Sequence, residues 1–132
     1  MRRMVGILVN DKEFQAVIKL PANIRYEYFI KKVVDEETVW GLYNDGWAVT
    51  EDEDGTLLLP FWPKKAFAQH CAIEEWAEYS CESIDLDELM EEFLPRLLED
   101  GYKPSIFFNN VDSAVLEVET LIRDLETELE NY

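Results

Sequence analysis

The sequence has little cysteine, a single histidine and no long apolar run, and each shortage excludes a class of protein. The two cysteines, Cys71 and Cys81, form neither a CxxC pair nor a metal-type quartet. We expect buried, reduced thiols, with a disulfide between them as the alternative. The longest apolar runs, such as Val5–Val9 and Leu57–Trp62, are far shorter than the roughly 20 residues that a membrane span needs. No small-residue cleavage site follows Met1–Met4, and we predict a cytoplasmic protein.

Residues for catalysis are equally scarce. His70 is the only histidine, and the adjacent Cys71 would point about 100° away from it on a helix, so the two cannot form a dyad by themselves. The sequence has no G-x-S-x-G, G-x-x-x-x-G-K-[ST] or G-x-G-x-x-G motif. We therefore interpret His70 as a half-buried helix residue, predict no catalytic residue and no cofactor, and favour a non-enzymatic protein.

One acidic stretch invites a metal interpretation. In "TEDEDG", Asp52 and Asp54 alternate before Gly55, as at the start of a calcium-binding loop. That motif needs a glutamate six residues after the glycine, where this chain has Phe61, and its first ligand position holds Thr50. We predict an acidic hairpin turn here and no metal site.

Negative charge dominates what is present. The chain has 29 Asp and Glu residues against 12 Lys and Arg, a net charge of -17. Such a balance disfavours binding to nucleic acid or to an anionic membrane. It favours a basic protein partner, although solvated helix faces account for it equally well. Hydrophobic residues make up 48% of the 132 residues, enough for one packed domain, and we assign no element to residues 1–10.

Periodicity predicts a mixture of helices and strands. Helices are expected over residues 12–20 with Asp11 as N-cap, and over 22–35, 64–72, 86–100 and 119–129. Strands are expected over residues 38–43, 47–50, 56–62, 104–110 and 114–118. Residues 73–83 are expected to form an irregular continuation and loop. The fold class is α+β: a single domain with a mostly antiparallel sheet of about five strands and amphipathic helices packed on it.

Two helices have the clearest pattern. Over 86–100, Asp85 and Glu88 suggest a capping box, Pro95 should kink the helix, and Gly101 should end it. The apolar stripe that should face the core there comprises Leu86, Leu89, Met90, Phe93, Leu94, Leu97 and Leu98. In the last helix the inward residues should be Leu121, Ile122, Leu125 and Leu129.

The turn at Asp45-Gly46 allows two registers. A two-residue turn pairs Leu42 with Val49 and puts Trp40, Leu42, Trp47 and Val49 on one face. A three-residue turn instead puts Trp47 beside Tyr43. We favour the first register because it assembles an aromatic core.

The sharpest candidate binding site follows from these strands. Trp40, Trp47 and Trp62 should converge, and Lys64 and Lys65 begin the next helix, where positive charge opposes the helix dipole. The lysines either face an anion with the backbone N–H groups or pair with the acidic turn at 51–54. The tryptophans form either a ligand cage or ordinary sheet core. We favour the pairing and the core, and we expect Arg25 and Tyr26 to join any site here if the second helix packs nearby.

Several of these residues resemble a known family. The segments that carry the resemblance are Arg25-Tyr26, Trp40-Gly41, Asp45-Gly46-Trp47 and Pro60-Phe61-Trp62-Pro63, followed by an acidic leucine-rich helix. They resemble the bacterial domain-of-unknown-function 2750 family over roughly residues 11–129. The resemblance implies a small cytoplasmic protein and carries over no catalytic or binding residue. The order of the elements is also similar to that of SseB-like domains, which are associated with interaction or toxin-neutralising roles.

Two functions follow from the sequence. The first is a non-enzymatic protein-interaction module, of which an immunity protein is one form, that binds a basic partner through the outward faces of residues 85–100 and 117–130. The alternative is a small-anion-binding module, or an enzyme of unrecognised type, at the Trp/Lys edge of the sheet. Nothing in the sequence determines the oligomeric state.

Overall fold

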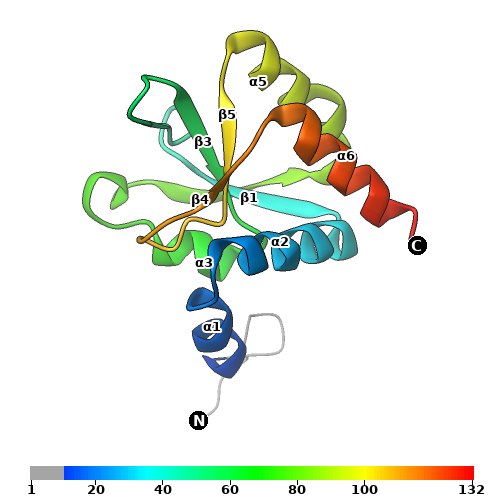
Figure 1. The fold of residues 1–132 in the computed structure, drawn as a ribbon. Coiled ribbons are helices and arrows are strands. Elements are labelled where there is room, and N and C mark those ends of the chain that lie inside the picture. The colour runs from blue at the N-terminus through cyan, green and yellow to red at the C-terminus, as the bar shows by residue number, and fades with distance from the viewer. Residues whose placement is uncertain (1–10) are drawn as a thin grey trace.

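The computed structural model describes residues 11–132, which contain both helices and strands (Figure 1). The helices are α1 (Asp11–Ile18), α2 (Ala22–Glu36), α3 (Lys65–His70), α4 (Leu86–Glu88), α5 (Leu94–Asp100) and α6 (Val118–Leu129). The strands are β1 (Thr38–Tyr43), β2 (Thr50–Glu51), β3 (Leu57–Phe61), β4 (Ser80–Asp85), β5 (Lys103–Ile106) and β6 (Ala114–Val115). The predicted α+β class is confirmed.

The strands form two sheets that share one bridge. β1 pairs with β4 in an antiparallel ribbon, and the second sheet has the order β2-β3-β5-β6. Its central pair, β3 and β5, is parallel, whereas both outer pairings are antiparallel. Trp40 and Trp62 exchange two backbone hydrogen bonds, of 2.9 and 2.8 Å, and so connect β1 to the end of β3.

Helices cover the two sheets from different sides. In Figure 1, α2 and α3 lie below β1 and β4, while α5 and α6 lie beside β5. The apolar faces of these elements meet in one buried cluster, in which Phe29, Phe61, Phe67 and Leu121 have no exposed surface. Burial of such side chains stabilises a domain of this size by about 1.5–3 kcal/mol each. Within residues 11–132, no helix has both the length and the apolar content of a membrane span.

The strand β4 lies where the sequence suggested a loop, which corrects that prediction. Its six residues, "SCESID", pair with β1 along their whole length, from Ser80 opposite Tyr43 to Asp85 opposite Thr38. Only Ile84 is buried. A strand with one buried side chain carries almost no hydrophobic pattern, so the ladder with β1 determines its structure.

The turn after β1 adopts the register that we did not favour. Tyr43 bridges Trp47, and the amide of Ala48 donates to the carbonyl of Leu42 over 2.8 Å. Asn44–Gly46 is therefore a three-residue loop, with Asp45 at a φ of 59°. Ala48 is buried and Val49 is exposed, the reverse of the favoured arrangement.

A glycine explains this register. A Cβ on Gly41 would lie 2.9 Å from the Trp47 ring, so only glycine leaves room for the indole against β1. The ring then packs edge-to-face on Tyr43, with centroids 5.1 Å apart. This contact replaces the predicted pairing of Leu42 with Val49.

The helical segment 86–100 differs from its prediction in three details. Asp85 precedes the helix in an extended conformation but makes no side-chain cap hydrogen bond, so the capping box is wrong. A π-helical turn, Leu89–Phe93, lies directly before Pro95 and widens the helix where the proline ring would meet a carbonyl. Leu98 at the end of this stripe is exposed, as is Leu129 in α6. Gly101 ends the helix with a φ of 80°, as predicted.

Candidate functional site

The three tryptophans of the predicted site do not form one cage. Trp62 is fully buried, and its indole N–H donates to the carbonyl of Phe108 over 2.8 Å. Trp47 packs over Gly41 and meets Phe93 edge-to-face at 5.6 Å. Because neighbouring residues of a strand point to opposite faces, Trp40 lies on the other side of β1 from the Trp47 ring. Trp62 is therefore core, and Trp47 lines a separate hollow of about 430 Å³.

The two lysines also separate. Lys64 makes an ion pair with Glu36 of α2, with 2.5 Å between Nζ and Oε2. This partner corrects the expected pairing with the acidic turn at 51–54. Within that turn Asp52 instead accepts hydrogen bonds from the backbone amides of Asp54 and Thr56, both 2.9 Å. Lys65 is exposed at the start of α3.

Arg25 is a buried residue whose hydrogen bonds connect α2 to the segment before it and to the loop after β5. Its Nε donates to the carbonyl of Phe107 over 3.1 Å, and Nη1 donates to the carbonyl of Leu20 over 2.6 Å. Nη2 donates both to the carbonyl and to the Oδ1 of Asp112, at 2.7 and 2.8 Å. The side chain is only 1% exposed, so its hydrogen-bonding capacity serves the fold.

Tyr26 connects two helices. Its hydroxyl donates to Oδ2 of Asp124 over 2.6 Å and so joins α2 to α6. Burial, and then the hydrogen bond to this carboxylate, raise the pKa of Tyr26 well above its ordinary value. The phenol is therefore a stable donor, half-buried between the helices.

Acidic side chains gather at the end of α2. The hollow there, which we call the acidic groove, has a volume of about 500 Å³. It is lined by Glu36, Glu37, Thr38, Asp85, Leu86, Asp87, Glu88, Glu91 and Glu92. The strands β1 and β4 bring the two sets together, because Thr38 lies opposite Asp85 in their ladder.

The acidic groove concentrates charge with little compensation. Glu36 pairs with Lys64, and this is the one ion pair that reaches the groove among those formed within residues 11–132. The last turn of α2 has no basic residue, and Glu37 caps it in a left-handed conformation with a φ of 56°. A carboxylate at a helix C-terminus opposes the dipole and costs roughly 0.3–1 kcal/mol. In the part of the chain that the structure describes, no cluster of His, Cys, Asp and Glu is arranged to hold a metal ion.

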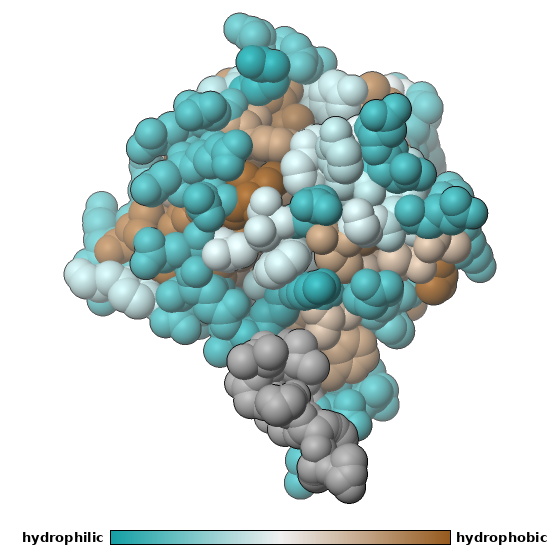
Figure 2. All heavy atoms as spheres, turned by 180° about the vertical axis from the view of Figure 1, so that it is seen from behind, coloured by the Kyte–Doolittle hydropathy of each residue, from teal (hydrophilic) through white to brown (hydrophobic). Residues whose placement is uncertain are grey.

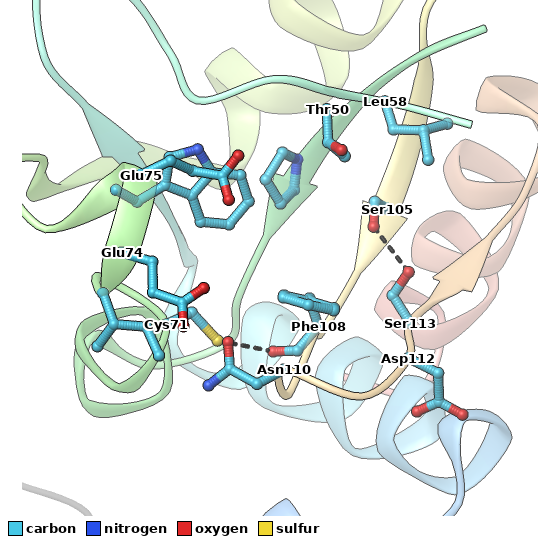
Figure 3. Close-up of a pocket in the computed structure, with 13 residues that line it drawn as sticks. Thr50, Leu58, Cys71, Glu74, Glu75, Ser105, Phe108, Asn110, Asp112 and Ser113 are labelled. Atoms are coloured by element: carbon cyan, nitrogen blue, oxygen red, sulfur yellow. Dashed lines mark hydrogen bonds between the residues drawn. The ribbon is translucent and has the colours of Figure 1, made fainter. Parts of the chain in front are cut away.

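Another hollow, which we call the sheet-face cleft, has a volume of about 380 Å³. The sheet supplies its floor: Thr50, Leu58, Pro60 and Ser105. The segment after α3 supplies one wall: Cys71, Ile73, Glu74, Glu75 and Trp76. The loop after β5 supplies the other: Phe108, Asn110, Asp112 and Ser113 (Figure 3). Alternation along β3 turns Leu58 and Pro60 away from the core residues Leu59 and Phe61.

Polar groups in the sheet-face cleft are held in fixed positions. Ser105, 3% exposed, donates its hydroxyl to Ser113 over 2.8 Å. The Cys71 thiol donates to the carbonyl of Phe108 over 3.2 Å, and burial raises the pKa of Cys71 to about 12. The thiol is neutral at physiological pH and is not prepared to act as a nucleophile.

The walls of the cleft have unusual backbone conformations. Glu74 has a φ of 54°, and in the loop after β5 Phe107 and Asn110 have values of 58° and 74°. A phenylalanine in the left-handed region costs of order 1–3 kcal/mol and needs support from its surroundings. Phe107 receives it from Arg25 and from its own amide, which donates to Phe61 over 2.9 Å. Arg25 therefore supports the cleft from behind.

His70 lines neither the acidic groove nor the sheet-face cleft, and it is exposed, not half-buried as predicted. Its ring meets Phe14 edge-to-face, with centroids 5.4 Å apart. Both cysteines are free thiols; Cys71 is buried as expected, while Cys81 is partly exposed.

The sheet-face cleft was not predicted from the sequence. Its only signal there was polar residues next to aromatic ones in "CAIEEW" and "FFNNVDS".

The fold is a small α+β domain that carries the acidic groove and the sheet-face cleft, and comparison with known proteins places it in a family. The family model described as "Protein of unknown function (DUF2750)" matches residues 26–125. The chain therefore belongs to this family, and the match starts and ends inside the 11–129 range expected from the sequence. No curated protein and no solved structure matches the chain.

Proposed function

We propose that this protein is a non-enzymatic interaction module that binds a basic protein partner through the acidic groove. The observation that carries the proposal is the convergence of seven carboxylates from α2, β4 and the helical segment after it on one hollow. Only Glu36 among them has a basic partner in the described residues. An uncompensated field of this kind attracts Lys and Arg side chains and speeds their encounter.

The placement of these carboxylates supports a binding role. Asp35, Glu36 and Glu37 end α2 in succession, although negative charge there opposes the helix dipole. Glu37 adds the strain of a left-handed conformation. Features that lower stability without a packing benefit are typical of functional surfaces. A basic segment bound in the groove would offset the repulsion.

The surface around the groove fits a partner that is recognised by charge. Apart from Thr38 and the apolar Leu86, the residues that line the groove are acidic, and Figure 2 shows hydrophilic residues around a central apolar area on the face seen from behind. The C-terminal end of α6 reaches the same region, since the Tyr132 hydroxyl donates to Asp35 over 3.4 Å. The outward faces of 85–100 and of α6 can thus contact one partner. A toxin-neutralising role in the cytoplasm is one form that such binding would take.

A comparison of matched variants tests this proposal. In the groove variant, Glu37, Glu91 and Glu92 are each changed to Gln. In the control variant, the exposed residues Glu51, Glu53 and Glu78 are changed to Gln, which removes the same charge outside the groove. Each protein is used to capture partners from the organism that encodes it, at low ionic strength where surface electrostatics act fully.

The expected result is a basic protein that wild type and the control variant retain and the groove variant loses. High salt should release it, because charge attraction is screened. Loss in both variants, or retention in both, would contradict a role for the groove. The alternative, anion binding at Lys64 and Lys65, stays a prediction, and the pairing of Lys64 with Glu36 weighs against it.

A further inference from the structure

We propose that the sheet-face cleft binds a small organic cation, an ammonium or guanidinium group on an apolar body. This site is separate from the acidic groove and does not depend on the proposed function. β4 runs from Ser80, close after the wall residue Trp76, to Asp85 in the groove. The two hollows share no lining residue.

The shape and position of the cleft are those of a ligand site. Its volume of about 380 Å³ lies within the range of pockets that bind small molecules. Its floor is the face of the sheet at the parallel pair β3 and β5, and its walls are the segment after α3 and the loop after β5. Leu58 and Pro60 provide an apolar floor, and Ile73, 47% exposed, forms part of the rim.

The charges in the cleft select a cation. Its lining contains Glu74, Glu75 and Asp112 and no lysine, arginine or histidine. Asp112 already pairs with Arg25 over 2.8 Å, and in Figure 3 its carboxylate points away from the hollow. The Glu74 carboxylate points inward, toward the space between Cys71 and Phe108 (Figure 3). Glu74 and Glu75 therefore give the hollow its net negative charge.

The aromatic side chains in the cleft suit the same ligand. Trp76 and Phe108 meet edge-to-face with centroids 6.3 Å apart, so they present two differently oriented rings to the hollow. A cation over the face of such a ring is attracted by its π-system, and more strongly when the cation is desolvated. The neutral Cys71 thiol lies beside them, and Ser113, which accepts from Ser105, can donate its own hydroxyl proton to a polar atom of the ligand. The site thus offers contacts for a charged head and for an apolar body.

A series of probes of equal shape and different charge tests the inference. Benzylammonium, benzyl alcohol and benzoate are titrated separately into the ¹⁵N-labelled full chain, and chemical shifts are followed by NMR. Benzylammonium should shift the backbone amides of Ser105 and Ser113 and the indole N–H of Trp76, with a Kd on the order of 1 mM. Benzyl alcohol should bind at least about fivefold more weakly, and benzoate should not bind, because the hollow is anionic.

A pair of matched variants tests whether the carboxylates of the cleft bind the cation. Changing Glu74 and Glu75 to Gln should weaken benzylammonium binding by about two- to fivefold for each residue. Changing the exposed Glu78 and Glu82 to Gln removes equal charge outside the cleft and should leave the affinity unchanged. If the first variant does not fold, the wild-type probe series alone decides.

Two sources of such a cation can be distinguished. The peptide Ac-Ala-Arg-Ala-NH₂ is titrated in parallel with benzylammonium. Equal or tighter binding of the peptide at the same resonances identifies an arginine side chain of a protein; binding of benzylammonium alone identifies a free small molecule. The inference is overturned if benzyl alcohol or benzoate binds as well as benzylammonium. It is also overturned if no resonance of the cleft shifts at concentrations about tenfold above the expected Kd.

Discussion

Arg25 shows how one residue determines a conformation far away in the sequence. It is buried from α2, yet three of its four hydrogen bonds go to residues 82 and 87 positions later. A buried guanidinium is tolerated only if its donors are satisfied, and the planar fork of arginine matches several acceptors at once. The sequence identified Arg25 as notable, but as a binding residue. The structure makes it the support of the loop that forms one wall of the sheet-face cleft.

Replacing Arg25 with lysine should destabilise the protein by about 2–4 kcal/mol. The ammonium cannot reach the carbonyls of Phe107, Leu20 and Asp112 together, so buried acceptors lose their partners. Urea unfolding measures the change. Arg123→Lys, at an exposed position on α6, is the control and should change stability by less than about 0.5 kcal/mol. Equal effects of the two substitutions would show that the Arg25 hydrogen bonds are not required.

The two thiols should react at very different rates. Burial raises the pKa of Cys71 from 9.0 to about 12, so its thiolate fraction at pH 8 falls by about 10³-fold. In a Cys81→Ser variant, labelling by a thiol reagent should be slower than in the urea-unfolded chain by about that factor. In a Cys71→Ala variant the partly exposed Cys81 should react faster than Cys71 does in the folded Cys81→Ser variant. Rapid labelling of Cys71 in the folded protein would contradict its burial.

The raised pKa of Cys71 also determines the direction of a pH effect. The pKa of Cys71 in the folded state lies above the ordinary value of 9.0. The stabilisation that the folded state gains by burying the neutral thiol is therefore complete below pH 9.0. It is lost as the pH rises through about 12.

At the scale of elements, helices with a clear apolar stripe could be predicted. α2 and α6 follow the expected ranges because their own side chains determine which face is buried. β4 could not be predicted, because its pattern is polar and only pairing with β1 makes it a strand. The register of the turn after β1 could not be predicted either. It depends on the space above Gly41 and not on the alternation of apolar and polar residues.

The close approach of β1 and Trp47 gives a test at this scale. Gly41→Ala places a methyl group 2.9 Å from the indole and should cost about 1–3 kcal/mol in the free energy of unfolding. In a Trp47→Ala background the same change should cost much less, because the clash is gone. Urea unfolding of the four proteins forms a double-mutant cycle. Additive effects would contradict the packing of Trp47 on Gly41.

The C-terminus of α2 gives a second test. Glu37 is exposed and left-handed, so Glu37→Gly should stabilise the protein by up to about 1 kcal/mol by relieving strain. Glu37→Gln keeps the strain and removes only the charge, so it should stabilise less. Thermal and urea unfolding measure both. Destabilisation by glycine would mean that this conformation is not strained.

At the scale of the whole molecule, periodicity predicted the class of fold and composition gave the excess of negative charge, but neither predicted where the charge gathers. The acidic groove exists because the ladder of β1 and β4 brings the end of α2 beside the segment that begins at Asp85. The sheet-face cleft likewise joins three segments that are distant in the chain. Contacts of this range leave no local pattern, so neither hollow could be located from the sequence.

NMR mapping of a lysine- and arginine-rich peptide on the ¹⁵N-labelled chain tests the central claim, that the acidic groove binds a basic partner. We predict shifts concentrated at Glu37, Asp85, Asp87 and Glu88, an affinity that falls steeply with salt, and loss of binding in the groove variant but not in the Glu51/Glu53/Glu78 control. Shifts spread evenly over all acidic surfaces, with equal affinity in both variants, would contradict it.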